Sequence, residues 1–342
     1  MSSPLDPSQI IQIGFGFWPS KVLLSAVELE LFTKLGSESL SAQELGKRLE
    51  MHPRGFYDFF DSLVALGLLA REGTGEKGRY KNTPQTALFL DKNKPESYVG
   101  GILEMLNARL YRFWGDLTEA LKTGKPQNEI KHTGAAMFDE LYRSPERLEQ
   151  FMNAMAGISR GNFQALAEKF DFSKYKTLCD VGGATGLLSI LTAKQHGHLQ
   201  CKSFDLPVVQ PIAKRHIGKA GLNGRVEAVA GDFFKEGLPK ADVITMGMIL
   251  HDWNLEGKKR LIRLAYDALP PGGAFVAIEN LIDDARRENA FGLGMSLNML
   301  IEFGDAFDYT GADFAGWCKE IGFKKTEVLH LNGPCSAAIA YK

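Results

Sequence analysis

A histidine that follows an apolar segment, with acidic residues nearby in the chain, has the residue types needed for proton transfer. His251 begins the sequence His-Asp-Trp, five positions after the end of the apolar stretch 243–246. Histidine can take a proton from a hydroxyl near neutral pH, and a carboxylate can fix its tautomer and stabilise the imidazolium. His251 is therefore our candidate general base, and the alternative is a structural histidine or a helix cap.

A glycine turn at 181–186 predicts a ligand-binding loop. The stretch 177–186 reads Thr-Leu-Cys-Asp-Val-Gly-Gly-Ala-Thr-Gly, an apolar strand followed by glycines. Gly182 and Gly183 would let a ligand approach backbone N–H groups, and residues 187–194 suit a helix whose N-terminus faces that ligand. Because the two glycines are adjacent, the G-x-G-x-x-G fingerprint for pyrophosphate is not matched. The alternative is an ordinary strand-to-helix turn.

Two further acids stand where strands should end. Asp205 closes the apolar stretch 201–205 and is placed to accept the hydroxyls of a ribose, which suits either NAD or S-adenosylmethionine. Asp232 and Phe233 follow the stretch 225–230 and could bind the amino group and the ring of an adenine. If the ligand were a dinucleotide, the second acid, Asp232, would have no role in binding it.

The residues named above lie on alternating strand and helix patterns. Strands are predicted at 177–181, 201–205, 225–230, 243–246 and 274–279, which indicates an open, mostly parallel sheet. Ligands of such sheets bind beyond the carboxyl ends of the strands. Helices are predicted at 98–122 and 137–169, with a polar turn-rich stretch between them. Met155 on the second helix is a candidate pocket wall, and the alternative is core packing.

The N-terminal part predicts a different module. Ser41-Ala-Gln-Glu44 has the form of a capping box, a second helix follows at 54–68, and two short strands lie at 68–72 and 79–83, as in a winged helix. A DNA-binding helix needs positive charge, yet this one carries Asp58 and Asp61 against Arg54. We therefore expect a structural or dimerising module. The apolar residues within 10–35 cover more than one helix face and suggest a subunit contact.

The composition bears on the number of domains, the class of partner and the cellular compartment. A chain of 342 residues with 44% hydrophobic residues suits two globular domains, and the net charge of −1 gives no general attraction to nucleic acid or to anionic membranes. The four cysteines form no C-x-x-C pair, so we expect a reduced, cytoplasmic protein without structural zinc. The sequence shows neither a signal peptide pattern nor 18 uninterrupted apolar residues.

The motifs occur together in an order that resembles one enzyme family. They are Asp-Val-Gly-Gly-Ala-Thr-Gly at 180–186, Phe-Asp-Leu-Pro at 204–207, Gly-Asp-Phe-Phe at 231–234, His-Asp-Trp at 251–253, Pro-Gly-Gly at 271–273 and Ile-Glu at 278–279. This order is similar to that of the caffeic acid and hydroxyindole (acetylserotonin) type O-methyltransferases. The resemblance implies an α/β fold with a Rossmann-like methyltransferase domain, S-adenosylmethionine as the cofactor, and a cytoplasmic homodimer. It implies domains at 1–97 (winged-helix-like, dimerising), 98–170 (linker and pocket helices) and 171–342 (catalytic).

The same resemblance assigns site residues. The catalytic residues are His251 as general base, flanked by Glu279 and Asp308. Gly182 and Gly183 would bind the methionine portion of the cofactor, Asp205 the ribose, and Asp232 with Phe233 the adenine. The expected cofactor-binding residues also include Leu206, Met246 and Gly247, the expected substrate-binding residues are Met155, Asp252 and Met299, and no metal is expected.

Two positions depart from the family pattern. Many relatives carry Lys or Arg four residues before the histidine, where this chain has Gly247. Either the backbone of Met246 or Gly247 replaces that contact, or the affinity for the cofactor is lower. Asp308 stands where the family often has the longer Glu.

The predicted reaction is methylation of a phenolic or enolic hydroxyl of a small aromatic or polyketide-like acceptor. The alternatives are a relative that keeps the cofactor but catalyses another reaction such as hydroxylation, an N-methyltransferase, and a winged-helix DNA-binding regulator.

Overall fold

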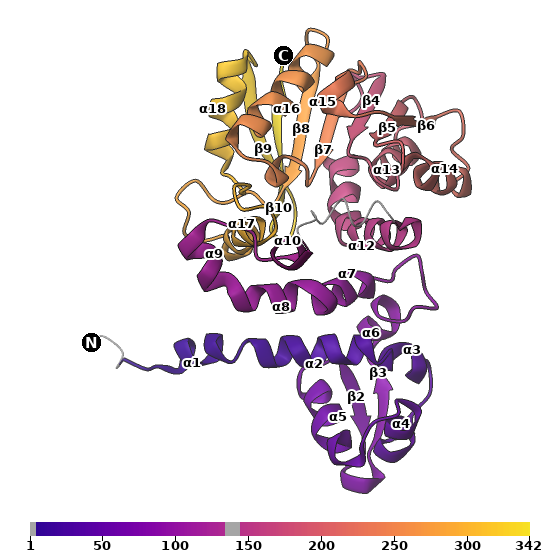
Figure 1. Cartoon of the computed structure of the whole chain (residues 1–342). Coiled ribbons are helices and arrows are strands. Elements are labelled where there is room, and N and C mark those ends of the chain that lie inside the picture. Colours follow the sequence, from indigo (N-terminus) through magenta and orange to yellow (C-terminus); the bar gives the residue numbers. More distant parts are fainter. Residues whose placement is uncertain (1–4, 134–143) are drawn as a thin grey trace. The chain divides into compact units, whose positions relative to one another are not determined.

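The computed structural model describes residues 5–133 and 144–342 (Figure 1). The chain divides after Arg112 into two compact units, each with its own core. The first part of the predicted helix at 137–169 lies outside the described residues. Its described part is α12 (Pro145–Lys169).

The first unit is mostly helical, with a small antiparallel sheet of order β1-β3-β2. Its elements are α1 (Ser8–Gly14), α2 (Phe17–Glu28), α3 (Leu31–Leu35), β1 (Leu40–Ser41), α4 (Ala42–Arg48), η1 (Pro53–Gly55), α5 (Phe56–Ala65), β2 (Leu69–Glu72), η2 (Gly75–Lys77), β3 (Arg79–Asn82), α6 (Pro84–Phe89), α7 (Gly100–Met105) and η3 (Leu106–Leu110). The predicted helix at 98–122 is therefore interrupted: α8 (Tyr111–Phe113) spans the boundary between the units, and η4 (Trp114–Asp116) and α9 (Leu117–Thr123) follow.

The capping box and the hairpin of this unit form as predicted. The Ser41 hydroxyl accepts a hydrogen bond from the Glu44 N–H at 3.2 Å, and the Glu44 carboxylate accepts one from the Ser41 N–H at 2.8 Å. The aromatic face of α5 is core, because Phe56 and Phe60 are buried. Arg54, in η1 just before α5, is paired with Asp58 of α5, so its positive charge is not free.

The second unit is a seven-stranded sheet of order β6-β5-β4-β7-β8-β10-β9. Its strands are β4 (Thr177–Val181), β5 (Gln200–Asp205), β6 (Val226–Ala230), β7 (Val243–Gly247), β8 (Ala274–Glu279), β9 (Lys325–Asn332) and β10 (Cys335–Tyr341). β4 to β8 are parallel, as predicted, whereas β9 and β10 are antiparallel and were not predicted.

Helices cover both faces of this sheet (Figure 1). The described helices of this unit after α9 are α10 (Glu129–Thr133), α12, α13 (Leu187–Gln195), α14 (Gln210–Lys219), α15 (Phe233–Glu236), η5 (Leu250–Asp252), α16 (Leu255–Ala268), α17 (Ala290–Phe303) and α18 (Gly311–Ile321). Side chains of α12, α13 and α14 form the core on one face, and those of α16 and α18 form the core on the other. α10 lies in the stretch for which turns were predicted.

Candidate functional site

The predicted site residues gather at one edge of the large sheet because parallel strands end on the same side. The glycine turn follows β4, Asp205 ends β5, Asp232 follows β6, Gly247 ends β7 and Glu279 ends β8. Residues far apart in the sequence are thereby placed along a single row of strand ends.

The glycine turn leaves no room for side chains. Gly182 has φ of +69°, and a Cβ there would lie 2.3 Å from a carbon of Ile249. A Cβ on Gly183 would lie 2.3 Å from the Ser203 hydroxyl oxygen, which is buried and makes no hydrogen bond within the described chain. The turn therefore requires glycine, and it presents backbone groups at the start of α13.

Asp205 is fixed against this turn. Its Oδ2 accepts a hydrogen bond from the Ala184 N–H at 2.8 Å, and its Oδ1 accepts one from the Leu206 N–H at 2.7 Å. Burial raises the pKa of Asp205, although both backbone bonds act to lower it. Each carboxylate oxygen keeps a further lone pair, so the group can still accept two hydroxyls of a ribose. These features fit the nucleoside part of S-adenosylmethionine.

Asp232 makes a hydrogen bond and an ion pair within the chain that the sequence does not reveal. Its Oδ1 accepts a hydrogen bond from the Phe234 N–H at 2.9 Å, and its Oδ2 lies 2.9 Å from Nζ of Lys235. The hydrogen bond from Lys235, with that from Phe234, lowers the pKa of Asp232. The Phe233 ring packs edge-on against Phe234 and Trp253, with centroids 4.7 and 6.0 Å apart. The ring is thus held beside the strand ends.

At the end of β7, an aromatic ring from α12 occupies the space beside Gly247. A Cβ on Gly247 would lie 3.0 Å from the ring of Phe163, which belongs to α12. Met246 is fully buried in the core, so only its backbone can contact a ligand. Phe163 was not singled out in the sequence, where it is one of several apolar residues at helical spacing.

Asp180, which opens the glycine motif but was given no role from the sequence, lies buried beneath the glycine turn. Its Oδ1 accepts a hydrogen bond from the Thr245 hydroxyl at 2.8 Å. Burial raises the pKa of Asp180 to about 7, with Thr245 acting to lower it and Asp205 to raise it.

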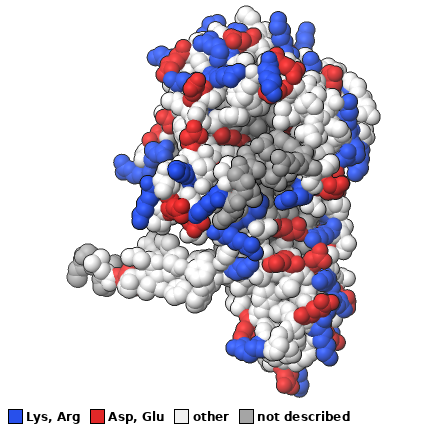
Figure 2. Space-filling model, in the orientation of Figure 1, with Lys and Arg blue, Asp and Glu red and all other residues white. Residues whose placement is uncertain are grey.

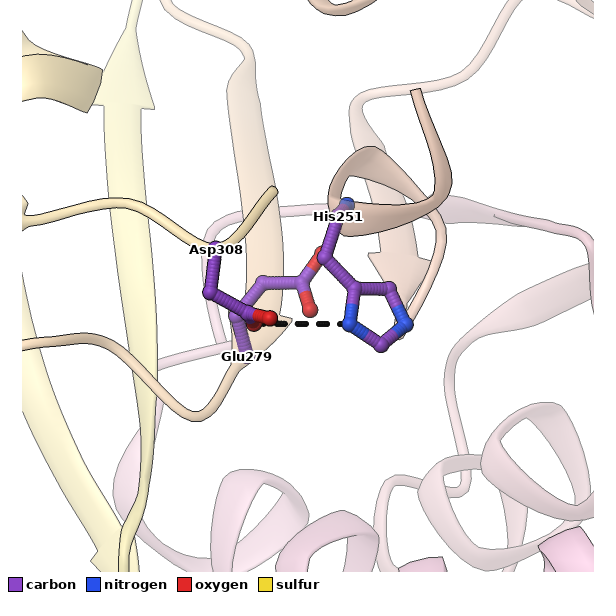
Figure 3. Close-up of side chains that lie close together, drawn as sticks. All are labelled: His251, Glu279 and Asp308. Atoms are coloured by element: carbon purple, nitrogen blue, oxygen red, sulfur yellow. Dashed lines mark hydrogen bonds and ion pairs between the residues drawn. The ribbon is translucent and has the colours of Figure 1, made fainter. Parts of the chain in front are cut away.

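His251, Glu279 and Asp308 form a buried cluster (Figure 3). Nδ1 of His251 lies 3.4 Å from Oδ1 of Asp308, and Figure 3 shows the other ring nitrogen facing away from that pair. That second nitrogen, Nε2, lies 3.3 Å from Oδ1 of Asp252, whose side chain is 22% exposed. Oε1 of Glu279 accepts hydrogen bonds from the N–H groups of Leu250 and His251 at 3.0 and 3.4 Å. The shorter Asp308 therefore reaches the ring, and Glu279 fixes the backbone of η5.

In this cluster, burial and the neighbouring charges shift the pKa of each group in opposite directions. Burial by itself lowers the pKa of His251, but Glu279, Asp252 and Asp308 together raise it to about 10. Burial raises the pKa of Glu279 to about 8 and that of Asp252 to about 6, against the influence of His251. An imidazolium is thus strongly stabilised here.

Three potential metal ligands also result from this arrangement, since one atom each of His251, Glu279 and Asp308 lie within 4.8 Å of one another. Nδ1 of His251 is buried and makes no hydrogen bond of good geometry within the described residues, and the same holds for Oε2 of Glu279 and for both Asp308 carboxylate oxygens. Such a set suits either a hydrogen-bonded base or a cation.

The expected substrate-binding residues lie on helices. Met155 is half-buried on α12, and Met299 is buried on α17, which packs beside η5. Asp252 lies in η5 itself. The structure thus places Asp252 at the histidine and Met299 on a helix that contacts the same short segment.

Comparison with known proteins identifies the family. Residues 114–324 match the O-methyltransferase domain, and residues 11–92 match the O-methyltransferase dimerisation domain. The tetracenomycin polyketide synthesis 8-O-methyl transferase TcmO of Streptomyces glaucescens is 39% identical over 98% of this chain and 97% of its own length. The N,N-dimethyltransferase OxyT of Streptomyces rimosus is 33% identical over 97% of this chain and 96% of its own length.

A solved structure agrees with these relatives. Human N-acetylserotonin methyltransferase in complex with S-adenosylmethionine has a TM-score of 0.90 and 28% identity, covering 100% of this chain and 99% of that one. These findings confirm the resemblance, the fold class and the cofactor expected from the motifs. The chain therefore belongs to the S-adenosylmethionine-dependent O-methyltransferases, with a dimerisation domain before the catalytic domain.

Proposed function

We propose that this enzyme methylates a phenolic or enolic hydroxyl of a small aromatic or polyketide-like acceptor, with His251 as the general base. The observation that carries the proposal is the arrangement of His251. Asp308 lies at Nδ1 on one side of the ring, and Nε2 faces away from that pair (Figure 3). The name of the 39% identical relative TcmO, a polyketide 8-O-methyl transferase, supports the acceptor class.

Each residue of the cluster then has one role in the reaction. When bound, S-adenosylmethionine supplies a methyl group on a positively charged sulfur, so the protein needs only to orient the acceptor and remove its proton. In the neutral form of His251, Nδ1 donates its proton toward Asp308, and the Nε2 lone pair, on the side of Asp252, takes the hydroxyl proton. Asp308, Glu279 and Asp252 stabilise the imidazolium that results. We propose that no metal takes part.

The cofactor-binding roles are proposals of the same kind. Backbone groups at Gly182 and Gly183 would bind the methionine portion, and Asp205 with Leu206 the ribose. Phe233 would pack on the adenine, and Asp232 would accept from its amino group while remaining paired with Lys235. Because Met246 is buried and Gly247 has no side chain, the end of β7 would contribute backbone atoms only.

We also propose a cytoplasmic homodimer that uses the N-terminal helices. Residues Ser8–Glu28 form a segment with mean hydropathy 1.4 that is long and apolar enough to cross a membrane. Figure 2 shows almost no charged side chains on its visible face. The match to the dimerisation domain begins within this segment, at residue 11, which favours a second copy of the chain as its partner. The four cysteines are free and buried, in keeping with a reducing compartment.

N-methylation is the second candidate, because the 33% identical relative OxyT is named an N,N-dimethyltransferase. Incubating the enzyme with S-adenosylmethionine carrying a ¹³C methyl group and a panel of hydroxylated and aminated aromatics separates the two. The carbon shift of the product distinguishes a methyl ether from an N-methyl group. We expect methyl ethers, and we expect EDTA to leave turnover unchanged. Products methylated only at nitrogen, or loss of turnover on chelation, would contradict the proposal.

A further inference from the structure

Four buried polar atoms of the candidate base cluster have no hydrogen-bond partner within the described chain. They are Nδ1 of His251, Oε2 of Glu279 and both carboxylate oxygens of Asp308. Buried polar atoms are nearly always paired, and an unpaired one calls for an explanation such as a catalytic role, a water or an ion. One atom from each of the three residues falls within 4.8 Å of the other two. A single occupant between them could therefore satisfy all three side chains.

The spacing of these atoms fits a first-row metal ion. A tetrahedral zinc ion holds nitrogen and oxygen ligands at about 2.0–2.2 Å, which separates two such ligands by about 3.3–3.6 Å. Nδ1 of His251 and Oδ1 of Asp308 lie 3.4 Å apart, which is within that range and longer than a good hydrogen bond. Figure 3 shows the carboxylates of Asp308 and Glu279 on the Nδ1 side of the ring. A small rotation of the Glu279 carboxylate would bring Oε2 to the same spacing.

The charges and donor types of the three ligands suit the same kind of ion. Glu279 and Asp308 are only 1% and 2% exposed, and buried carboxylates are costly unless an opposite charge balances them. A dication would balance both. Imidazole is a good ligand for zinc, whereas Mg²⁺ and Ca²⁺ take oxygen ligands. The donor set therefore favours zinc over the two hard cations.

The groups around the three ligands are those that a metal site needs. A metal-bound histidine usually donates its other ring N–H to a carboxylate or carbonyl, and Nε2 of His251 lies 3.3 Å from Oδ1 of Asp252. Ligating carboxylates are themselves hydrogen-bonded, and Oε1 of Glu279 accepts from the Leu250 N–H at 3.0 Å, so that Oε2 is the atom offered to the ion. In the part of the chain that the structure describes, no other three His, Cys, Asp or Glu side chains bring their ligand atoms this close.

We propose that His251, Glu279 and Asp308 bind one zinc-like divalent cation, and that this ion inhibits the enzyme. A metal on Nδ1 requires the ring proton to be on Nε2, where Asp252 accepts it, whereas abstraction of a proton from the acceptor needs the Nε2 lone pair. The two uses of the ring exclude each other. The ion is thus an inhibitor and takes no part in methyl transfer. Only the inhibition rests on the proposed role of His251 as base; the metal site does not.

The first measurement is a calorimetric titration of the full-length enzyme with zinc chloride, after EDTA has been added and dialysed away. The wild type should bind one ion per chain in this cluster. His251→Gln, Glu279→Gln and Asp308→Asn each remove one ligand with little change in size. Each should weaken zinc binding by about 100-fold or more, because losing a group that only supports a ligand typically costs about 10–100-fold. Asp252→Ala removes such a supporting group and should fall in that lower range.

Controls separate this site from adventitious binding. His330→Gln removes an exposed histidine of β9 and should bind zinc as the wild type does. Magnesium chloride should not displace the zinc. A titration with S-adenosylhomocysteine checks that each variant is folded. The inference would be overturned if the wild type shows no saturable zinc binding, if the three ligand variants keep the wild-type affinity, or if the affinity is lost in His330→Gln instead.

The second measurement follows turnover as the site fills. The rate of methyl transfer should fall in proportion to zinc occupancy and should return when EDTA removes the ion. The affinity for S-adenosylhomocysteine should stay the same, because its proposed contacts follow β4, β5 and β6 rather than β8. If zinc fills the cluster and turnover persists, the metal site stands and the proposal that His251 is the base fails. If zinc does not bind, the metal site fails and the proposed base is unaffected.

Discussion

Nδ1 of His251 and Oδ1 of Asp308 lie 3.4 Å apart although the two residues are separated by 57 positions in the sequence (308 − 251). The contact is longer than a well-aligned hydrogen bond, and catalytic hydrogen bonds often shorten only when substrate binds. Both side chains are almost completely buried, with relative exposures of 6% and 1%. The carboxylate is thus placed to select the tautomer in which Nδ1 carries the proton.

Replacing His251 with Gln should lower methyl transfer by about 10²–10⁴-fold while leaving the binding of S-adenosylhomocysteine nearly intact, because a positioned base is worth that much. Asp308→Asn should give a smaller loss, since the imidazole remains but its orientation and its positive form lose support. Single-turnover rates and calorimetric titrations measure the two quantities separately. Turnover at the wild-type rate in His251→Gln would remove the histidine from the mechanism.

Asp205→Ala should weaken the binding of S-adenosylhomocysteine by about 1.5–3 kcal/mol, because hydrogen bonds to charged groups are the stronger class. The change also leaves the Ala184 and Leu206 N–H groups without their acceptor, so Asp205→Asn, which keeps one acceptor oxygen, should lose less. Asp267→Ala on the exposed side of α16 is the control for a lost surface carboxylate. Equal affinity of the wild type and Asp205→Ala in calorimetry would place the ribose elsewhere.

Much of this site could be predicted because it follows strand ends. The run before Glu279 is continuously apolar, as in strands buried on both faces, whereas the stretch before Asp205 also contains Lys202 and Ser203. Asp205 and Glu279 end their strands, and Asp180 is the last residue but one of β4. The alternation in Lys325–Asn332 was a usable but overlooked strand signal, whereas the alanine-rich Cys335–Tyr341 resembles a helix as much as a strand.

Contacts between elements that are distant in the chain could not be predicted from the sequence. Phe163 reaches Gly247 only because α12 packs on the face of the sheet from which β7 presents that glycine. Similarly, the ring of Phe307 meets Lys258 through the packing of the segment after α17 against α16. Helical spacing predicts that these side chains are apolar or amphipathic, but it does not specify their partners.

Gly247→Lys should destabilise the enzyme by about 1–3 kcal/mol, because the new side chain competes with the Phe163 ring for space. Phe163→Ala makes room, so in the double variant the lysine should cost less stability than in the single one. The coupling energy from a double-mutant cycle of thermal unfolding measures this. Calorimetry on the double variant then tests whether a basic residue at this position raises the affinity for S-adenosylhomocysteine over Phe163→Ala alone. Additive effects on stability would mean that Phe163 does not occupy the space.

The buried Asp180 makes stability depend on pH. Its pKa is about 7 in the folded chain against an ordinary 3.8, so between these values the folded state binds the extra proton. Its stabilising contribution is complete below about pH 4 and is lost as pH rises through about 7. Asp180→Asn mimics the protonated form and can still accept from Thr245. It should therefore gain roughly 2–4 kcal/mol relative to the wild type at pH 8, and little at pH 4. Urea unfolding across this range measures the difference, and a gain that does not vary with pH would contradict the assignment.

The exposed apolar side chains of α1 and α2 should form a subunit contact. Ile10 and Ile13 are 76% and 73% exposed, and Phe17 and Trp18 are 54% and 56% exposed. Soluble monomers rarely expose apolar patches of this size, and burying them stabilises a dimer by roughly 25 cal/mol per Å². Deleting the residues before Ser20 should therefore abolish dimer formation and, if the segment completes the partner's site, activity as well.

A double variant, Ile13→Ser with Trp18→Ser, tests the same surface without shortening the chain. It should also yield monomers by light scattering while keeping the far-ultraviolet circular dichroism of the wild type. Activity should fall in parallel with the dimer fraction as the protein is diluted, because the active form is then the dimer. A full-length wild-type chain that is monomeric at micromolar concentration and fully active would contradict the predicted dimer. The apolar segment would then have another partner, and a lipid surface would be the next candidate to test.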